Sequence, residues 1–153
     1  MSVDLTRLRA YYAATKGSPY RLGAKWPISN PPELVKGDPV DCSGWVRWAL
    51  AQTSPWVLPD GSQCQWAYVR DTLGWREVPY HNLRYCENDP TRLFIAFKRA
   101  AAKNGRVLKH GHVLLVSNGQ TIESFGGRGV GSREWDCATL RRIAAACCEV
   151  PVG

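Results

Sequence analysis

Two side chains in this sequence, a cysteine and a histidine, have the types and surroundings that nucleophilic catalysis needs. Cys42 lies in the run Asp41-Cys42-Ser43-Gly44, where a helix is expected to begin. Unpaired N–H groups at the start of a helix favour the thiolate, which is the reactive form of cysteine. The backbone N–H of Cys42 can also donate to an oxyanion, and the small residues Ser43 and Gly44 leave room for a substrate backbone.

A general base must reach that thiol, and His112 is the best candidate. His112 stands at the start of the apolar run 113–116, which is typical of a buried strand. A histidine at the mouth of an ordered strand is held in one orientation, as proton transfer requires. His110 is the competing candidate, and we expect it to be a loop residue at the rim of the site. We therefore predict Cys42 as the nucleophile and His112 as its base.

The strand that begins at His112 is predicted to form a hairpin. The segments 112–117 and 120–125 flank Asn118-Gly119, a dipeptide strongly preferred in two-residue hairpin turns. This turn sets the register, so that Ser117 faces Gln120 and the pairing continues outward from there.

The register identifies a third member of the constellation. Glu123 becomes the diagonal neighbour of His112 on the same face of the sheet, whereas Ser124 points to the other face. A carboxylate in that place would bind the imidazole N–H and fix its tautomer. The alternative is that Glu123 is an ordinary strand residue paired with Arg128 or Arg133. We favour the catalytic role.

The preceding part of the chain must position the nucleophile. We predict a helix over residues 4–15, a long surface loop over 23–40, and a second helix that opens around Cys42. Asp41 or Ser43 is expected to cap this second helix. The nucleophile therefore stands at the junction between a long loop and a helix.

Further elements are predicted downstream. The pattern of Ser62 to Gln65 indicates a capping box that opens a third helix, and Gly74 ends it. A strand is predicted over 75–79, and the apolar run 93–97 suits either a buried strand or the start of a helix. Residues 126–131, which are rich in glycine, are expected to form a flexible bend.

Composition indicates one globular domain over residues 1–153. Hydrophobic residues make up 44% of the chain and charged residues 22%, and the formal net charge is +7. The charge favours anionic partners, but the basic residues are scattered, so it is weak evidence for nucleic acid binding. Seven Trp and six Tyr are many for this length. We expect most of these rings to fill the core and the others to suit a substrate groove.

The cysteines do not indicate a metal site. No C-x-x-C pair occurs, and His81, His110 and His112 stand at no zinc-ligand spacing from any cysteine, so neither metal nor cofactor is expected. The absence of an apparent leader predicts synthesis in the cytoplasm, where disulfides are disfavoured. Cys64, Cys86 and Cys147 are expected to be small buried side chains. Whether any of Cys64, Cys86, Cys137, Cys147 and Cys148 form disulfides stays open.

At these residues the sequence resembles the NlpC/p60 family of papain-like cell-wall peptidases. The resemblance extends from about Ser18 to Trp135, and the order of the matching pieces is more specific than any one of them. These pieces are Pro19-Tyr20-Arg21-Leu22-Gly23, Asp41-Cys42-Ser43-Gly44-Trp45-Val46, Gly111-His112-Val113-Leu114-Leu115-Val116, Asn118-Gly119 and Thr121-Ile122-Glu123.

The resemblance implies an α+β, papain-like fold in which the nucleophile helix packs on a small antiparallel sheet. It implies an endopeptidase that cleaves peptidoglycan stem peptides, typically between D-glutamate and a diamino acid. Cys42 and His112 match the nucleophile and the base, and Tyr20 matches a ring whose hydroxyl lines the site. Asp41 matches an acid that binds the free amino group of a stem peptide. Ser43 is expected to bind substrate together with Tyr20 and Asp41.

The sequence departs from the family pattern in three places. The third catalytic position is more often His than Glu123, the usual Pro-Gly-Asp is missing before the strand near 92–97, and the interval from Cys42 to His112 is long. The last departure predicts an insertion over 75–91 or 100–109 that reshapes the substrate groove.

Two other functions fit the same residues. One is an amidase of the CHAP type that cuts between the sugar and L-alanine, and the other is a non-catalytic cell-wall-binding module. In each case the expected partner is bacterial peptidoglycan rather than nucleic acid, and the expected state is a monomer without a membrane span. The absence of a leader suits a phage or prophage lysin, a tail hydrolase or an injected effector that acts at the cell wall.

Overall fold

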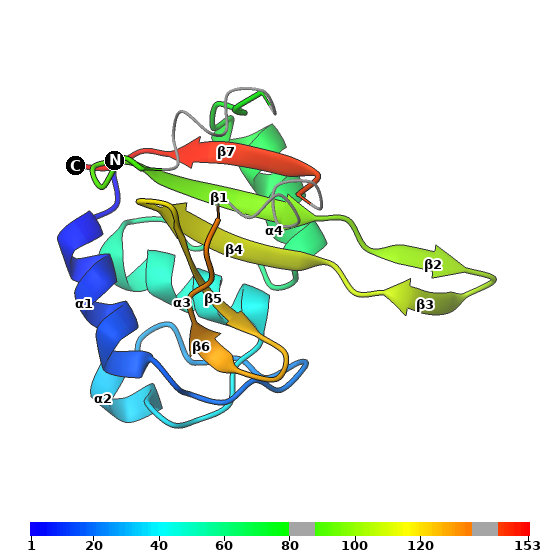
Figure 1. Cartoon of the computed structure of the whole chain (residues 1–153), viewed down its shortest axis with the longest axis horizontal. Coiled ribbons are helices and arrows are strands. Elements are labelled where there is room, and N and C mark those ends of the chain that lie inside the picture. Colours follow the sequence, from blue (N-terminus) through cyan, green and yellow to red (C-terminus); the bar gives the residue numbers. More distant parts are fainter. Residues whose placement is uncertain (80–87, 136–143) are drawn as a thin grey trace.

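The computed structural model describes residues 1–79, 88–135 and 144–153, which form an α+β fold (Figure 1). The helices are α1 (Leu5–Thr15), α2 (Pro32–Val35), α3 (Cys42–Thr53) and α4 (Ser62–Tyr68), the last continuing into a π-helical turn, η1 (Val69–Leu73). The strands are β1 (Leu93–Lys98), β2 (Ala101–Lys103), β3 (Arg106–Lys109), β4 (His112–Ser117), β5 (Gln120–Phe125), β6 (Gly129–Gly131) and β7 (Ala146–Val150). The predicted fold class is confirmed.

Five strands form one antiparallel sheet in the order β6-β5-β4-β1-β7. The interior strand β1, between β4 and β7, is buried on both faces, because Leu93, Ile95 and Phe97 join the main core while Phe94 and Ala96 join a smaller cluster on the opposite face. A strand buried on both sides has no polar alternation. The run 93–97 was therefore ambiguous in sequence, and it is a strand.

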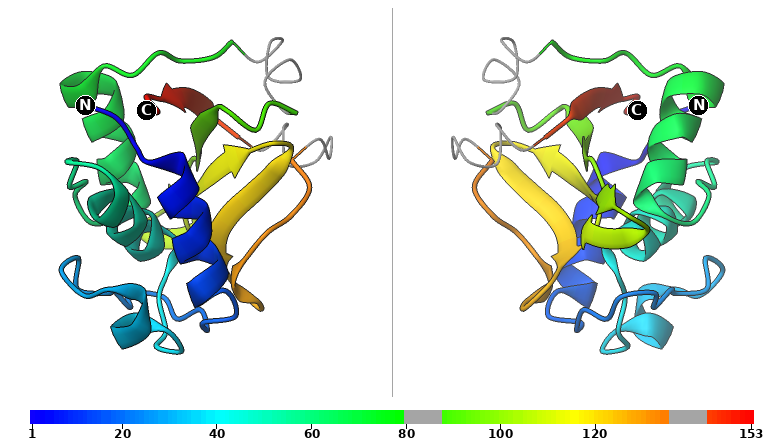
Figure 2. Two further views of the ribbon diagram at one scale, coloured as in Figure 1. Left: turned by 90° about the vertical axis from the view of Figure 1, so that its left-hand side faces the viewer. Right: turned by 90° about the vertical axis from the view of Figure 1, so that its right-hand side faces the viewer.

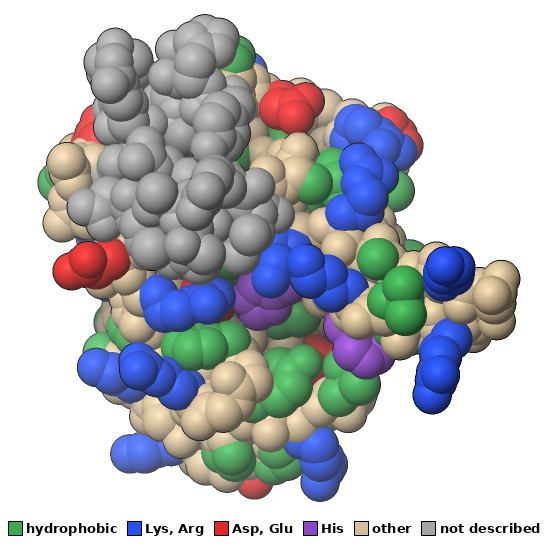
Figure 3. Space-filling view, turned by 45° about the vertical axis from the view of Figure 1, so that its right-hand side comes forward, with side chains coloured by type: hydrophobic (Ala, Val, Ile, Leu, Met, Phe, Trp, Pro, Cys, Tyr) green, Lys and Arg blue, Asp and Glu red, His purple; other side chains and the backbone are tan. Residues whose placement is uncertain are grey.

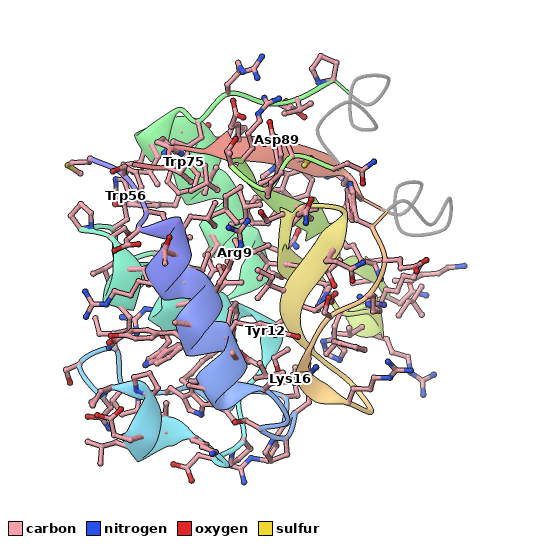
Figure 4. The ribbon with its side chains drawn as sticks, turned by 60° about the vertical axis from the view of Figure 1, so that its left-hand side comes forward. Arg9, Tyr12, Lys16, Trp56, Trp75 and Asp89 are labelled. Carbon is pink, nitrogen blue, oxygen red and sulfur yellow. The ribbon has the colours of Figure 1, made fainter. Side chains whose placement is uncertain are left out.

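The helices cover one face of this sheet (Figure 2). Helix α3 packs against β4 and β5, and α1 packs against α3. The core between the layers is rich in tryptophan, as expected, since five of the seven Trp side chains are buried in it. Trp56 and Trp75, for example, meet edge to face with ring centroids 5.0 Å apart (Figure 4).

The predicted hairpin is formed with the expected register. Asn118 and Gly119 have φ angles of 54° and 73°, the left-handed pair that a type I′ turn needs. Ser117 pairs with Gln120 and Leu115 with Ile122. The turn chemistry thus fixed which residues of β4 and β5 share a face.

Other local predictions need correction. Helix α4 is preceded by Gly61 and has no side-chain cap, so the predicted capping box is absent, and Ser62 is the first helical residue. The predicted strand over 75–79 is reduced to a bridge between Glu77 and Cys148. The predicted bend over 126–131 contains β6, which pairs with β5.

The long loops also hold structure that the sequence pattern did not predict. Helix α2 interrupts the loop over 23–40. In the predicted insertion over 100–109, β2 and β3 form a separate two-stranded sheet around a left-handed Asn104-Gly105 turn. Residues 80–87 of the other suggested insertion lie outside the described part of the chain. No helix in the described part is both long and apolar enough to cross a membrane.

Candidate active site

The start of α3 carries the predicted nucleophile. Asp41 is the N-cap residue, and its Oδ1 accepts a hydrogen bond from the backbone N–H of Gly44 at 2.7 Å. Cys42 is the first residue of the helix and is 7% exposed. The thiol therefore lies where free N–H groups and the helix dipole favour a negative charge.

His112 links the thiol to the sheet. The thiol of Cys42 lies close enough to the imidazole to help raise the pKa of His112. Its Nε2 lies 2.7 Å from Oε1 of Glu123, and because a carboxylate only accepts, Nε2–H must donate. Nδ1 is then the ring nitrogen left to take a proton from the thiol. The contact between His112 and Glu123 that the hairpin register predicted is therefore present.

Glu123 has a second cationic partner. Arg133 donates from one NH₂ group to Oε1 at 2.6 Å and from Nε to Oε2 at 3.1 Å. The Glu123 side chain is fully buried, whereas one third of the Arg133 side chain is exposed. The sequence had posed an ion pair with arginine and a contact with histidine as alternatives, and the structure contains both.

The buried carboxylate and imidazole shift each other's protonation. Burial alone would raise the pKa of Glu123, but hydrogen bonds from His112 and Arg133 outweigh it, and the net pKa is lowered. Burial alone would lower the pKa of His112, but hydrogen bonds with Cys42 and Glu123 outweigh it, and the net pKa is raised above 6.5. The arrangement thus keeps Glu123 ionised and stabilises the imidazolium that forms when the thiol gives up its proton.

A pocket of about 230 Å³ opens beside the nucleophile. Tyr20 lies at this pocket, and the pKa of its hydroxyl is raised by partial burial and by the nearby Cys42 and Asp41. His110 lines the rim and is exposed, as predicted. The other lining residues are Leu22, Gly23, Lys25, Asp41, Cys42, Ser43, Gly61, Ser62 and Gly111.

Lys25 is the residue of this pocket that sequence reasoning missed. Its Nζ lies 2.7 Å from both carboxylate oxygens of Asp41 and 2.7 Å from Oγ of Ser43. The N–H of Gly23 also donates to Oδ2 of Asp41, at 3.0 Å. The Asp41 side chain is 6% exposed and that of Lys25 is 30% exposed. The predicted substrate-binding residues Tyr20, Asp41 and Ser43 are therefore gathered at one pocket, with Asp41 already neutralised.

A buried glutamine, Gln65 of α4, forms a hydrogen bond with the first turn of the nucleophile helix α3. Gln65 is fully buried, and its amide donates to the carbonyl oxygens of Ser43 at 2.9 Å and Pro59 at 3.0 Å. A glutamine in a helical pattern is normally assigned to the solvent face. Nothing local marks this one, because its partners belong to other segments.

Among the described residues, Cys64, Cys147 and Cys148 do not line the pocket beside Cys42. Cys64, which we expected to be buried, is exposed, whereas Cys147 is buried as expected. Burial also raises the pKa of Cys148 to about 11. Cys86 and Cys137, like His81, lie outside the described residues. Within residues 1–79, 88–135 and 144–153, no cluster of three or more His, Cys, Asp and Glu side chains is suited to a metal ion.

Comparison with solved structures identifies the fold. The chain superposes on the NlpC/p60 domain of the peptidoglycan hydrolase SagA with a TM-score of 0.58 and 17% identity, covering 95% of this chain and 98% of that domain. It matches an NlpC/p60 family protein from Bacillus cereus (TM-score 0.62, 18% identity) and NlpC2 from Trichomonas vaginalis (TM-score 0.63, 17% identity), over 99% and 100% of its own length.

The chain spans 41% of the length of the Bacillus cereus protein and 48% of that of NlpC2. No protein-family model matches the sequence, and no curated protein matches it significantly. At this level of identity the likeness establishes the fold, which is that of an NlpC/p60 domain, as the sequence motifs predicted.

Proposed function

We propose that the chain is a peptidoglycan hydrolase, a cysteine endopeptidase that cleaves stem peptides at the bond between D-glutamate and a diamino acid. The observation that carries the proposal is the connected set of Cys42, His112 and Glu123, in which a thiol at a helix start contacts an imidazole held by a carboxylate. Support for the substrate comes from the fold, which is shared with the NlpC/p60 domain of a peptidoglycan hydrolase.

The proposed mechanism assigns one role to each of these side chains. His112 Nδ1 accepts the proton of Cys42, and the thiolate attacks the amide carbonyl carbon. The N–H of Cys42 contributes to holding the oxyanion. His112 then gives its proton to the leaving amine, and water, deprotonated by His112, hydrolyses the thioester and restores the thiol. Glu123 keeps the Nε2 proton in place throughout.

Substrate binding is assigned to the pocket beside Cys42, with Tyr20, Asp41 and Ser43 in its wall. Lys25 restricts which substrates Asp41 can bind, because its ammonium group already occupies the position that a substrate amine would take beside the carboxylate. A carboxylate with a partner at 2.7 Å attracts a second cation only weakly. The pocket therefore favours a stem peptide whose first residue is acylated, as in intact peptidoglycan, over one with a free amino group.

The contacts of Cys42 argue against a non-catalytic binding module. A module that only binds has no use for a buried carboxylate that holds a histidine against a thiol. An amidase of the CHAP type would use the same chemistry at another bond, and the products distinguish the two reactions.

The test is mass spectrometry of purified sacculi digested by the protein. Endopeptidase action releases fragments with new D-glutamyl carboxyl ends, whereas amidase action releases intact stem peptides and leaves free lactyl ends on the glycan. New D-glutamyl ends support the proposal. Free lactyl ends, or no fragments at all, contradict it.

The biological setting proposed with this activity is the bacterial cell wall. We place one peptidase domain over residues 1–153, acting as a monomer in a phage or prophage lysin, a tail hydrolase or an injected effector. The net charge of +7 would favour adhesion to an anionic envelope.

A further inference from the structure

The β2–β3 hairpin projects from the body of the molecule like an arm (Figure 1). All residues from 99 to 110 are exposed, so neither face of this hairpin packs on the core. An isolated two-stranded hairpin is only marginally stable in water and adds little to the stability of a fold. We call residues 99–110 the arm, and its exposure indicates a role in contact with another molecule.

The base of the arm, at Lys98 and Arg99, contacts helix α4. Arg99 lies over the ring of Trp66, 5.0 Å from its centroid, and Trp66 stacks on Phe97 of the core strand β1. The side chain of Gln63 donates to the carbonyl oxygen of Lys98 at 3.1 Å. The arm therefore leaves the body from a fixed point, which gives the exposed portion a defined position relative to the site.

The arm is strongly cationic. Its twelve residues include four Lys and Arg and no Asp or Glu, and Lys98 adds a fifth cation directly before it. Among the described residues, no carboxylate forms an ion pair with Lys103, Arg106 or Lys109. Burial, and after it the neighbouring cations of Lys109 and Arg133, lowers the pKa of Lys98 at the base of the arm, whereas Glu123 and Cys42 act in the opposite direction. Val107 and Leu108 add exposed apolar surface, 57% and 61% exposed.

The arm runs directly into the candidate active site. Strand β3 ends at Lys109, and the next residues, His110 and Gly111, line the pocket beside Cys42. The base His112 follows at once as the first residue of β4. Figure 3 shows basic side chains and histidine side chains on the face from which the arm projects. A polymer that lies along the arm is thereby led to the nucleophile.

We propose that the arm binds polymeric peptidoglycan, its Lys and Arg side chains pairing with stem-peptide carboxylates next to the stem being cleaved. This inference rests on the proposed function and names the part of the chain that holds the polymer. Carboxylates are the anions that recur along the proposed substrate, and exposed cations without internal partners are free to pair with them. Val107 and Leu108 provide apolar contact to the alanine methyl groups and sugar faces of the same polymer.

The test compares two charge-matched double variants of the full chain. Lys103→Gln/Arg106→Gln removes two charges at the outer end of the arm, and Lys16→Gln/Lys36→Gln removes two exposed charges elsewhere. Each pair is combined with Cys42→Ala, and binding to sacculi stripped of wall phosphate polymers is measured by sedimentation. We expect the arm variant to bind about fivefold more weakly, or about 1 kcal/mol. The control should bind as Cys42→Ala alone, and the difference should shrink in high salt.

Equal binding by the two double variants would overturn the proposal. So would a loss seen only on unstripped sacculi, because the anion would then be a phosphate of a wall polymer. With Cys42 intact, the arm variant should lose more turnover on sacculi than on a soluble, N-acylated stem tetrapeptide. Cleavage of that tetrapeptide by the unaltered protein tests the proposed function separately, so the two ideas can fail independently.

Discussion

The carboxylate of Glu123, fully buried in β5, accepts a hydrogen bond from Nε2 of His112 in β4 at 2.7 Å. The two residues are eleven positions apart, and the type I′ turn at Asn118-Gly119 brings them onto one face of the sheet. The bond leaves Nδ1 of His112 for the Cys42 thiol. Turn geometry, rather than a sequence motif, therefore sets the orientation of the proposed base.

The first prediction concerns the two thiols that differ most in environment. Cys42→Ala removes only the nucleophilic sulfur. It should therefore abolish lysis of purified sacculi while the protein remains folded. Cys64→Ala, which replaces an exposed cysteine, should leave lysis unchanged. Turbidity loss of sacculi and circular dichroism are the measurements. Lysis by Cys42→Ala at the original rate would rule out the covalent mechanism.

The second prediction is a pH dependence. Contacts with Cys42 and Glu123 raise the pKa of His112 above 6.5, and the imidazole must be unprotonated to accept the thiol proton. Activity should therefore fall as pH decreases through that raised pKa, so the acidic limb should lie at higher pH than for an ordinary histidine. In Glu123→Gln the limb should move to lower pH, and kcat should fall at least about tenfold, since general-base catalysis contributes about 10²–10⁴-fold.

Ser124→Ala is the matched control for that profile. Ser124 lies next to Glu123 but donates to the carbonyl oxygen of Val40, away from the imidazole. Its profile should keep the midpoint of the unaltered protein. A larger loss of kcat in Ser124→Ala than in Glu123→Gln would show that the roles have been assigned to the wrong residue of the pair.

The third prediction concerns the charge of the substrate at the pocket. Lys25→Met frees the Asp41 carboxylate, so the ratio of kcat/KM for a free-amine stem peptide to that for its N-acylated form should rise about tenfold, or about 1.4 kcal/mol. Lys25→Arg should keep the preference for the acylated peptide, because it retains the positive charge. An unchanged ratio in Lys25→Met would show that this ion pair has no part in specificity.

The fourth prediction concerns stability. Gly129 has a φ of 76°, and a Cβ built on it would lie 1.9 Å from the carbonyl oxygen of Ser18. Since that obstacle is backbone, Gly129→Ala should destabilise the protein by about 2 kcal/mol or more, as strained backbone substitutions do. Gly126→Ala, where a Cβ has open space, is the control. Denaturant unfolding measures both, and equal stability of the two variants would contradict the close approach.

Local chemistry in the sequence determined a large part of this molecule. Asp41 before Cys42 indicated a capped helix start, and Asn118-Gly119 indicated both the hairpin and its register. Such features follow from the backbone geometry of a few adjacent residues, so they can be read without knowing the fold. Asn104-Gly105 offered the same turn signal in the arm, but its flanking strands lack the apolar run that made the other hairpin recognisable.

The tertiary structure alone decided which distant side chains complete the site. Lys25 reaches Asp41 across the loop that precedes α3, and Arg133 reaches Glu123 from beyond β6. The amide NH₂ group of buried Gln65 donates to carbonyl oxygens from two other segments. An ion pair or a buried hydrogen bond depends on the distance between groups in space, and sequence separation does not fix that distance. The sequence therefore identified the reacting groups, whereas the fold set their charge environment and the exposed arm beside them.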